Sequence, residues 1–202
     1  MSNEELDFLS ALRDVMLAIE GRYPGMIIGG IAIIAWGYPR VTTDIDVTLR
    51  IDLNDLNQLV KTLRTHEIYP RIDDAINFAR TRHVLLMRHH KSGVDIDVSL
   101  ALLPFEEEAI SNRQFVDFST VQIAVPRPED LVIYKMVAFR PEDLRDVEEL
   151  LLRHSPGMNL NRVRKLVREF AKVLDRPQMV EKLEELLRKT RPQSERKEKK
   201  AE

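Results

Sequence analysis

Two aspartates near the start of the chain have the type and spacing needed for phosphate chemistry. Asp44 and Asp46 alternate with Ile45 and Val47 in a strand-like segment. Successive side chains of a strand point to opposite faces, so the two carboxylates share a face and lie about 6.5–7 Å apart. Such a pair can bind two divalent cations about 3.5–4 Å apart, the arrangement used in phosphoryl and nucleotidyl transfer. The two acids therefore predict a metal-binding face of a β-sheet.

Two adjacent glycines, Gly29 and Gly30, precede these acids. They follow a short apolar run over 26–28 and begin a second one that reaches Trp36. We interpret the pattern as a strand, a glycine turn and a helix. Backbone amides without side chains can approach a phosphate closely, and the N-terminal end of a helix dipole favours the negative charge. The glycines therefore predict a phosphate site beside the metal-binding face.

A second Asp-x-Asp, formed by Asp95 and Asp97, lies in another strand-like segment over 94–100. If this strand pairs with the first, a third carboxylate joins the site. Asp95 and Asp97 have the same parity and face the same way, so alternation does not choose between them.

Gly29-Gly30 followed by Asp44-x-Asp46 in an apolar strand resembles the signature of DNA polymerase β-type nucleotidyltransferases. The intervening Gly37-x-x-Arg40-x-Thr42-x-Asp44-Ile45-Asp46 is similar, more narrowly, to a small prokaryotic branch that includes AbiEii-like toxins. The resemblance covers residues 26–150. It implies an α/β nucleotidyltransferase fold, with a small mixed sheet flanked by helices and a C-terminal helical appendage.

The resemblance also implies roles for the acids. Asp44, Asp46 and a third acid would hold Mg²⁺, with two ions expected and an NTP as the substrate. Family members place the third acid shortly before a Pro-Phe-Glu-like helix start, which favours Asp97 because residues 104–106 match that start. Asp97 is then also the candidate general base, and Asp95 stays as the alternative.

Further residues receive expected roles from the same resemblance. Gly29, Gly30, Arg40 and Thr42 would bind the nucleotide. A second signature, an apolar helix followed by Arg-x-x-Asp-x-x-Asp over 140–146, implies that Lys135 contacts the triphosphate. Asp143 and Asp146 share one helical face and would hold Arg40 or position an acceptor. Many family members have serine where Gly30 stands, so this chain lacks one hydroxyl contact to phosphate.

The sequence does not decide which class of molecule accepts the nucleotide. The AbiEii-like resemblance implies an RNA acceptor such as the tRNA 3′ end, a toxin role and a cognate antitoxin. A small-molecule hydroxyl, as in antibiotic-modifying nucleotidyltransferases, is the alternative within the enzyme class. A non-catalytic nucleotide-binding or interaction module is the alternative from another class.

Composition limits the remaining possibilities. The 202 residues are 44% hydrophobic and 32% charged, typical of a globular protein. The absence of cysteine excludes disulfides and cysteine-bound zinc, and no apolar run has the length of a membrane span, so we expect a cytoplasmic protein with no membrane partner. Lys and Arg are in excess after residue 159, which suggests an acidic partner such as RNA, although a solvated helix face is the simpler explanation.

Periodicity predicts the elements that position these residues. We expect a nucleotidyltransferase core over 1–155, a C-terminal helical region over 156–190 and a disordered tail over 191–202. Helices are expected over about 4–22, 52–64, 73–80, 105–112, 131–139 and 140–154, with two more after 159. Strands are expected over about 26–28, 44–51, 84–88, 94–100, 114–118 and 121–125.

Overall fold

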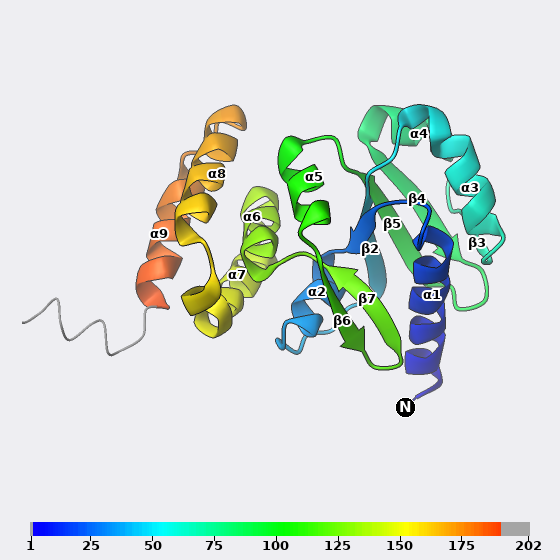
Figure 1. Cartoon of the computed structure of the whole chain (residues 1–202), viewed down its shortest axis with the longest axis horizontal. Coiled ribbons are helices and arrows are strands. Elements are labelled where there is room, and N and C mark those ends of the chain that lie inside the picture. The colour runs from blue at the N-terminus through cyan, green and yellow to red at the C-terminus, as the bar shows by residue number, and fades with distance from the viewer. Residues whose placement is uncertain (1, 191–202) are drawn as a thin grey trace, which may run out of the picture. The chain divides into compact units, whose positions relative to one another are not determined.

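The computed structural model describes residues 2–190 and divides into two compact units (Figure 1). The first unit extends to Arg127 and the second begins at Pro128. The boundary that we predicted between residues 155 and 156 therefore lies inside the second unit. The predicted disordered tail lies outside the described residues.

The first unit is built on a five-stranded mixed sheet with the order β1-β2-β5-β4-β3. β2 and β5 are parallel and lie side by side (Figure 1), and the other neighbours are antiparallel. The strands are β1 Gly25–Ile27, β2 Asp44–Leu49, β3 Ile68–Pro70, β4 Val84–His89 and β5 Asp95–Leu100. A separate hairpin consists of β6 Gln114–Phe118 and β7 Val121–Val125.

Alternation explains how β2 and β5 sit in this sheet. Ile45, Val47, Ile96 and Val98 are fully or almost fully buried, whereas the aspartates between them face the other side and are partly exposed. Each strand therefore contributes apolar side chains to the core and carboxylates to one shared face.

Side-chain caps mark the start of two helical elements of the first unit. Ser2 and Glu5 form a reciprocal capping box at α1, with Glu5 N donating to Ser2 Oγ over 3.2 Å. Asp52 accepts a 2.8 Å hydrogen bond from Asn54 N and starts the 3₁₀ turn η1. The elements are α1 Asn3–Ile19, α2 Gly29–Ala35, η1 Leu53–Asp55, α3 Leu56–Arg64, α4 Ala75–Arg82 and α5 Pro104–Ser111.

The second unit is helical throughout its described part. Its elements are α6 Pro128–Ala138, α7 Pro141–His154, the 3₁₀ turn η2 Ser155–Gly157, α8 Leu160–Val173 and α9 Gln178–Lys189. Val163, Val167 and Ala171 form the buried stripe of α8, and Met179, Leu183 and Leu187 are buried from α9. The two helices predicted after residue 159 are confirmed, although Val173, which we expected on the apolar stripe of the first, is 81% exposed.

Most predicted elements are confirmed, with ends that differ by up to three residues from the expectation. β3 was not predicted, because three residues that end in a proline carry almost no periodic signal. The helix expected over 73–80 begins at Ala75 instead, since Asp74 has φ +51° and lies outside helical geometry. Within residues 2–190, no helix is both long and apolar enough to cross a membrane.

Candidate active site

The pairing of β2 with β5 places four carboxylates on one face of the sheet. The parallel register sets Asp44 opposite Asp95 and Asp46 opposite Asp97. The second Asp-x-Asp strand therefore lies beside the first, as the third-acid hypothesis requires. The register makes Asp97 the direct neighbour of Asp46, while the selection of Asp97 over Asp95 stays a prediction.

Gly29 lies directly against the Asp46 carboxylate. It has φ +63°, and a Cβ at this position would overlap Asp46 Oδ2. The two segments are also tied by the backbone, since Ile28 N donates to Asp46 O over 2.9 Å. Both the backbone conformation and the close approach therefore require glycine at this position.

Gly30 makes a second close approach, to the loop before β2. A Cβ on Gly30 would lie 2.6 Å from Thr42 Oγ1 and 3.6 Å from Arg40 Nε. The Thr42 hydroxyl in turn donates to Asp44 Oδ1 over 3.1 Å. The start of α2 thus gathers Arg40, Thr42 and the first carboxylate pair into one site, although their contacts with a nucleotide stay predictions.

Two arginines that we did not predict as site residues face the second carboxylate pair, Asp95 and Asp97. Arg71 Nη1 lies 2.7 Å from Asp97 Oδ1 and 3.7 Å from Asp95 Oδ2, and Arg88 Nε lies 2.6 Å from Asp95 Oδ1. The hydrogen bond from Arg88 is the main reason why the pKa of Asp95 lies below its ordinary value. The position of Arg88 could have been predicted from the sequence, because the predicted hairpin over 84–100 places Arg88 opposite Asp95. The position of Arg71 could not, because it follows the unpredicted strand β3.

The donors suit Mg²⁺ in type, since it is a hard cation that prefers carboxylate oxygens. Asp44, Asp46 and Asp97 also share a face in the register that the chemistry requires. As the side chains of residues 2–190 lie, no three His, Asp or Glu groups are arranged to hold a metal ion together. The residue types and their order therefore fit the ion, while the third acid is paired with Arg71.

Lys135, Asp143 and Asp146 form a buried ion cluster in the second unit. Lys135 Nζ lies 3.0 Å from Asp143 Oδ1 and 2.8 Å from Asp146 Oδ2, and Arg140 Nε lies 2.7 Å from Asp143 Oδ2. Burial acts to raise the pKa of Asp143, but hydrogen bonds from Arg140 and Lys135 outweigh it and hold the pKa below its ordinary value. Contact of Lys135 with a triphosphate stays a prediction, and it requires the ammonium to leave two buried carboxylates.

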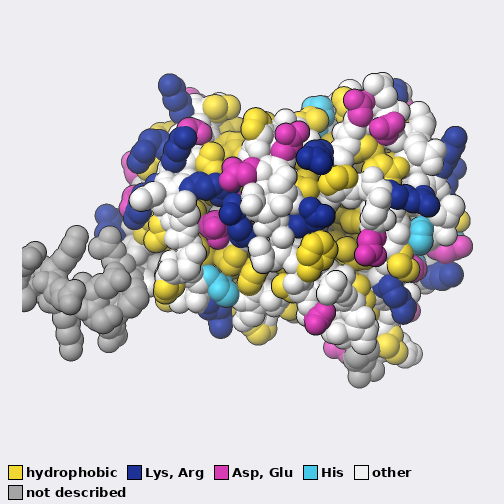
Figure 2. Space-filling model, in the orientation of Figure 1, with side chains coloured by type: hydrophobic (Ala, Val, Ile, Leu, Met, Phe, Trp, Pro, Cys, Tyr) yellow, Lys and Arg dark blue, Asp and Glu magenta, His cyan; other side chains and the backbone are white. Residues whose placement is uncertain are grey.

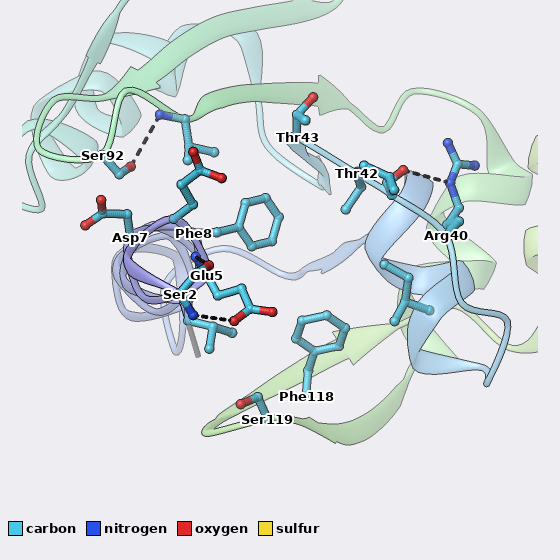
Figure 3. Close-up of a pocket in the computed structure, with 15 residues that line it drawn as sticks. Ser2, Glu5, Asp7, Phe8, Arg40, Thr42, Thr43, Ser92, Phe118 and Ser119 are labelled. Atoms are coloured by element: carbon cyan, nitrogen blue, oxygen red, sulfur yellow. Dashed lines mark hydrogen bonds between the residues drawn. The ribbon is translucent and has the colours of Figure 1, made fainter.

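A cavity of about 860 Å³ adjoins the loop that carries Arg40 and Thr42 (Figure 3). Phe8 of α1 and Phe118 of β6 point into it, and three acidic residues of α1 also line it: Glu4, Glu5 and Asp7. Its lining includes neither the four strand carboxylates nor Gly29 and Gly30. The cavity therefore meets the candidate site only at the loop before β2.

A mixed sheet with an Asp-x-Asp strand beside a Gly-Gly helix start defines a protein of the nucleotidyltransferase class. The chain belongs to the family described as nucleotidyltransferase of unknown function (DUF6036), whose model matches residues 6–191. None of the curated proteins matches the sequence. The comparisons do not distinguish an AbiEii-like branch.

Solved structures support the same fold. A putative nucleotidyltransferase from Helicobacter pylori has 16% identity and a TM-score of 0.55, over 90% of this chain and 82% of its own. The antibiotic-resistance factor ANT(2'')-Ia has 15% identity and a TM-score of 0.56, over 83% and 93%. The same factor in complex with adenylyl-2"-tobramycin has 16% identity and a TM-score of 0.54, over 84% and 99%. These similarities confirm the predicted α/β nucleotidyltransferase fold.

Proposed function

We propose that this protein transfers a nucleoside monophosphate from an NTP to an acceptor hydroxyl in a Mg²⁺-dependent reaction. The observation that carries the proposal is the parallel register of β2 and β5. It sets Asp46 beside Asp97 while the Asp46 carboxylate lies against Gly29. The carboxylates proposed to hold metal and the amides proposed to bind phosphate are thereby adjacent, which nucleotidyl transfer requires.

In this proposal, Asp44, Asp46 and Asp97 hold Mg²⁺, which supplies charge stabilisation at the α-phosphate and the leaving oxygen. The amides of Gly29 and Gly30 bind phosphate oxygens. Thr42 orients Asp44 through its hydroxyl. Asp97 accepts the proton of the acceptor hydroxyl as that oxygen bonds to the α-phosphorus and pyrophosphate leaves with the bonding electrons.

An RNA acceptor is the first candidate, and a basic stripe on α8 supports it. Lys165, Arg168 and Lys172 are exposed at i, i+3 and i+7, so they share one side of the helix. Figure 2 shows Lys and Arg side chains, with Asp and Glu side chains among them, over the part of the surface where α8 lies, and Glu169 pairs with Lys165 at 4.0 Å. Such a stripe suits the phosphate backbone of RNA. With this acceptor, the protein would act as an AbiEii-like toxin on a tRNA 3′ end in the cytoplasm, with an antitoxin as its partner.

A cationic small molecule is the second candidate, and the cavity beside the loop supports it. Its three carboxylates would attract amines, and its two phenylalanines would cover an apolar ring face. The resistance factor ANT(2'')-Ia, which shares the fold, carries an adenylylated aminoglycoside in one of its structures. This candidate places the acceptor next to Thr42 and Thr43 rather than on α8.

The test is incubation with each α-³²P-labelled NTP and Mg²⁺, offering total bacterial RNA in one arm and aminoglycosides in another. Wild type is compared with Asp46→Asn, and with Lys165→Glu/Arg168→Glu as a surface variant. Label entering RNA only with Asp46 intact supports the first candidate, and loss of that transfer in the α8 variant assigns the stripe to RNA. Label entering an aminoglycoside supports the second.

The outcome that contradicts the proposal is nucleotide binding without turnover. If NTP binds with equal affinity to wild type and to Asp44→Ala/Asp46→Ala, and no acceptor is labelled, the chain is a nucleotide-binding or interaction module that retains the fold. Metal-dependent binding that the double variant loses would instead keep the enzyme class and direct attention to other acceptors.

A further inference from the structure

Arg71 occupies the position where a cation would meet the third acid. Its Nη1 atom lies 2.7 Å from Asp97 Oδ1, within ion-pair distance. The same nitrogen donates to Met87 O over 3.3 Å, and Arg71 N donates to Leu86 O over 3.1 Å. The guanidinium is therefore positioned by the backbone of β4 and does not depend on a flexible surface side chain.

The environment strengthens this ion pair. The side chain of Arg71 is 21% exposed, compared with 54% for Arg88. An ion pair that is shielded from water on one side is screened less than an exposed one. Asp97 is therefore neutralised in the structure by a group that the chain itself provides.

A divalent cation and this guanidinium draw on the same negative charge, because Arg71 already lies on Oδ1 of the carboxylate that would coordinate the ion. Coordination requires an oxygen within about 2.0–2.1 Å of Mg²⁺. Two positive groups cannot both lie this close to Asp97 without strong repulsion. Each cation therefore weakens the binding of the other.

We propose that Arg71 is a built-in counter-ion of Asp97 with which a divalent cation must compete, so that Arg71 lowers the metal affinity of the site. This inference rests on the proposed function, because it takes Asp97 as a metal ligand. It predicts that the site binds cations weakly at low cation concentration, because Arg71 already compensates the charge of Asp97.

Arg88 provides a matched control on the same face. It carries the same charge and pairs with Asp95, two residues from Asp97, and its register partner across the sheet is also Asp95. Removing Arg88 changes the net charge of the site equally but leaves the Asp97 ion pair in place. A difference in metal affinity between the Arg71 and Arg88 variants therefore reports on competition for Asp97.

The experiment is titration of the full chain with Mn²⁺ in the absence of nucleotide, with free Mn²⁺ measured by electron paramagnetic resonance. We expect Arg71→Gln to bind Mn²⁺ about tenfold more tightly than wild type, because both the competitor and its repulsion are removed. Arg88→Gln should change the affinity much less. In the Asp97→Asn background, Arg71→Gln should give little or no gain, since the contested oxygens are altered.

Equal gains in the two arginine variants would overturn the proposal, because they would indicate a general charge effect. The proposal would also be overturned if Arg71→Gln raised the Mn²⁺ affinity equally in the wild-type and the Asp97→Asn backgrounds. If Arg71→Gln does not fold, Arg71→Lys is measured instead; it keeps the charge but lacks the fork, so a smaller gain is expected and an unchanged affinity counts against the proposal.

This result is separable from the proposed function. Tighter Mn²⁺ binding in Arg71→Gln with no labelled acceptor would support the counter-ion and reject nucleotidyl transfer. Nucleotidyl transfer by wild type, with no change of Mn²⁺ affinity in Arg71→Gln, would support the proposed function and reject the counter-ion role of Arg71.

Discussion

Both units of this protein pair aspartates with cationic side chains, but the two clusters differ in burial. In the second unit, the side chains of Asp143 and Asp146 are 0% and 3% exposed, and Lys135 is 7% exposed. In the first unit, Asp95 and Asp97 are 38% and 34% exposed. Asp95 and Asp97 are therefore partly open to water and dissolved ions, whereas Asp143 and Asp146 are shielded and face the protein's own cations.

The comparison indicates which acids serve folding and which are available for chemistry. A buried carboxylate without a partner is strongly destabilising. Lys135 is therefore needed for the stability of the folded state, because it compensates the charges of the buried Asp143 and Asp146. A half-exposed carboxylate tolerates an exchange of partners, which metal binding demands. Burial, rather than residue type, separates a structural ion cluster from a candidate active site.

The largest expected effect is that of Lys135→Met. Loss of the ammonium leaves Asp143 and Asp146 buried with less compensation, and we expect the free energy of unfolding to fall by about 3–5 kcal/mol. Urea unfolding followed by circular dichroism measures it. The control is Lys189→Met, which removes an ion pair with Glu148 in which the lysine side chain is 60% exposed, and which should change stability by about 0–1 kcal/mol. Similar losses in the two variants would mean that burial does not decide how much an ion pair contributes to stability.

A smaller effect is expected at the glycine that touches the candidate site. Gly29→Ala forces a side chain into a conformation with φ +63° and into the Asp46 carboxylate, so it should cost about 2–3 kcal/mol and abolish the proposed transfer. Gly37→Ala is the control, because Gly37 has φ +87° but nothing within 4 Å of an added Cβ. It should show the backbone penalty alone, about 1 kcal/mol. If Gly29→Ala and Gly37→Ala lost equal stability and activity, the close contact between Gly29 and the Asp46 carboxylate would contribute nothing beyond the backbone penalty.

The pH dependence of stability should separate the clusters further. Because the pKa of Asp143 is lower in the folded protein than its ordinary value of 3.8, its stabilising contribution is complete above that value and is lost as pH falls through the folded pKa. In Arg140→Gln the folded pKa should rise, so acid unfolding should begin at higher pH. Circular dichroism between pH 5 and pH 2 tests this expectation.

The matched control for that titration lies on the same helix. Arg153→Gln removes an exposed i,i+4 pair with Glu149 and should leave the acid midpoint near that of wild type. A shift as large as that of Arg140→Gln would mean that helix charge, and not the pKa of Asp143, controls acid unfolding.

The smallest effect on stability is expected for Asp46→Asn. The side chain is partly exposed, and its charge is close to the other carboxylates of the face, so the free energy of unfolding should change by at most about 0.5 kcal/mol or rise slightly. The proposed transfer should be lost. Asp146→Asn, tested in parallel, should destabilise the protein, because it weakens a buried pair. If Asp46→Asn destabilises as much as Asp146→Asn, the exposed acids also serve folding.

Local patterns were sufficient for much of the fold. Alternation located β2 and β5, and helical periodicity located α8 and α9, because both signals come from the residues of the element itself. The Gly29-Gly30 and Asp44-x-Asp46 motifs were also visible, and the structure brings them together. The sequence could not show which cations face the acids. Arg71 reaches Asp97 only through the pairing of β3 with β4, and Lys135 meets Asp143 only through the packing of α6 on α7.

The register of β2 has a consequence for folding as well as for the site. If β2 paired with β5 one residue out of step, Asp44 and Asp46 would enter the core and Ile45 and Val47 would face water. Burying two carboxylates without partners is prohibitively unfavourable, so the slipped arrangement cannot compete with the native one. The residues assigned to chemistry therefore also help the chain to reject a misaligned sheet while it folds.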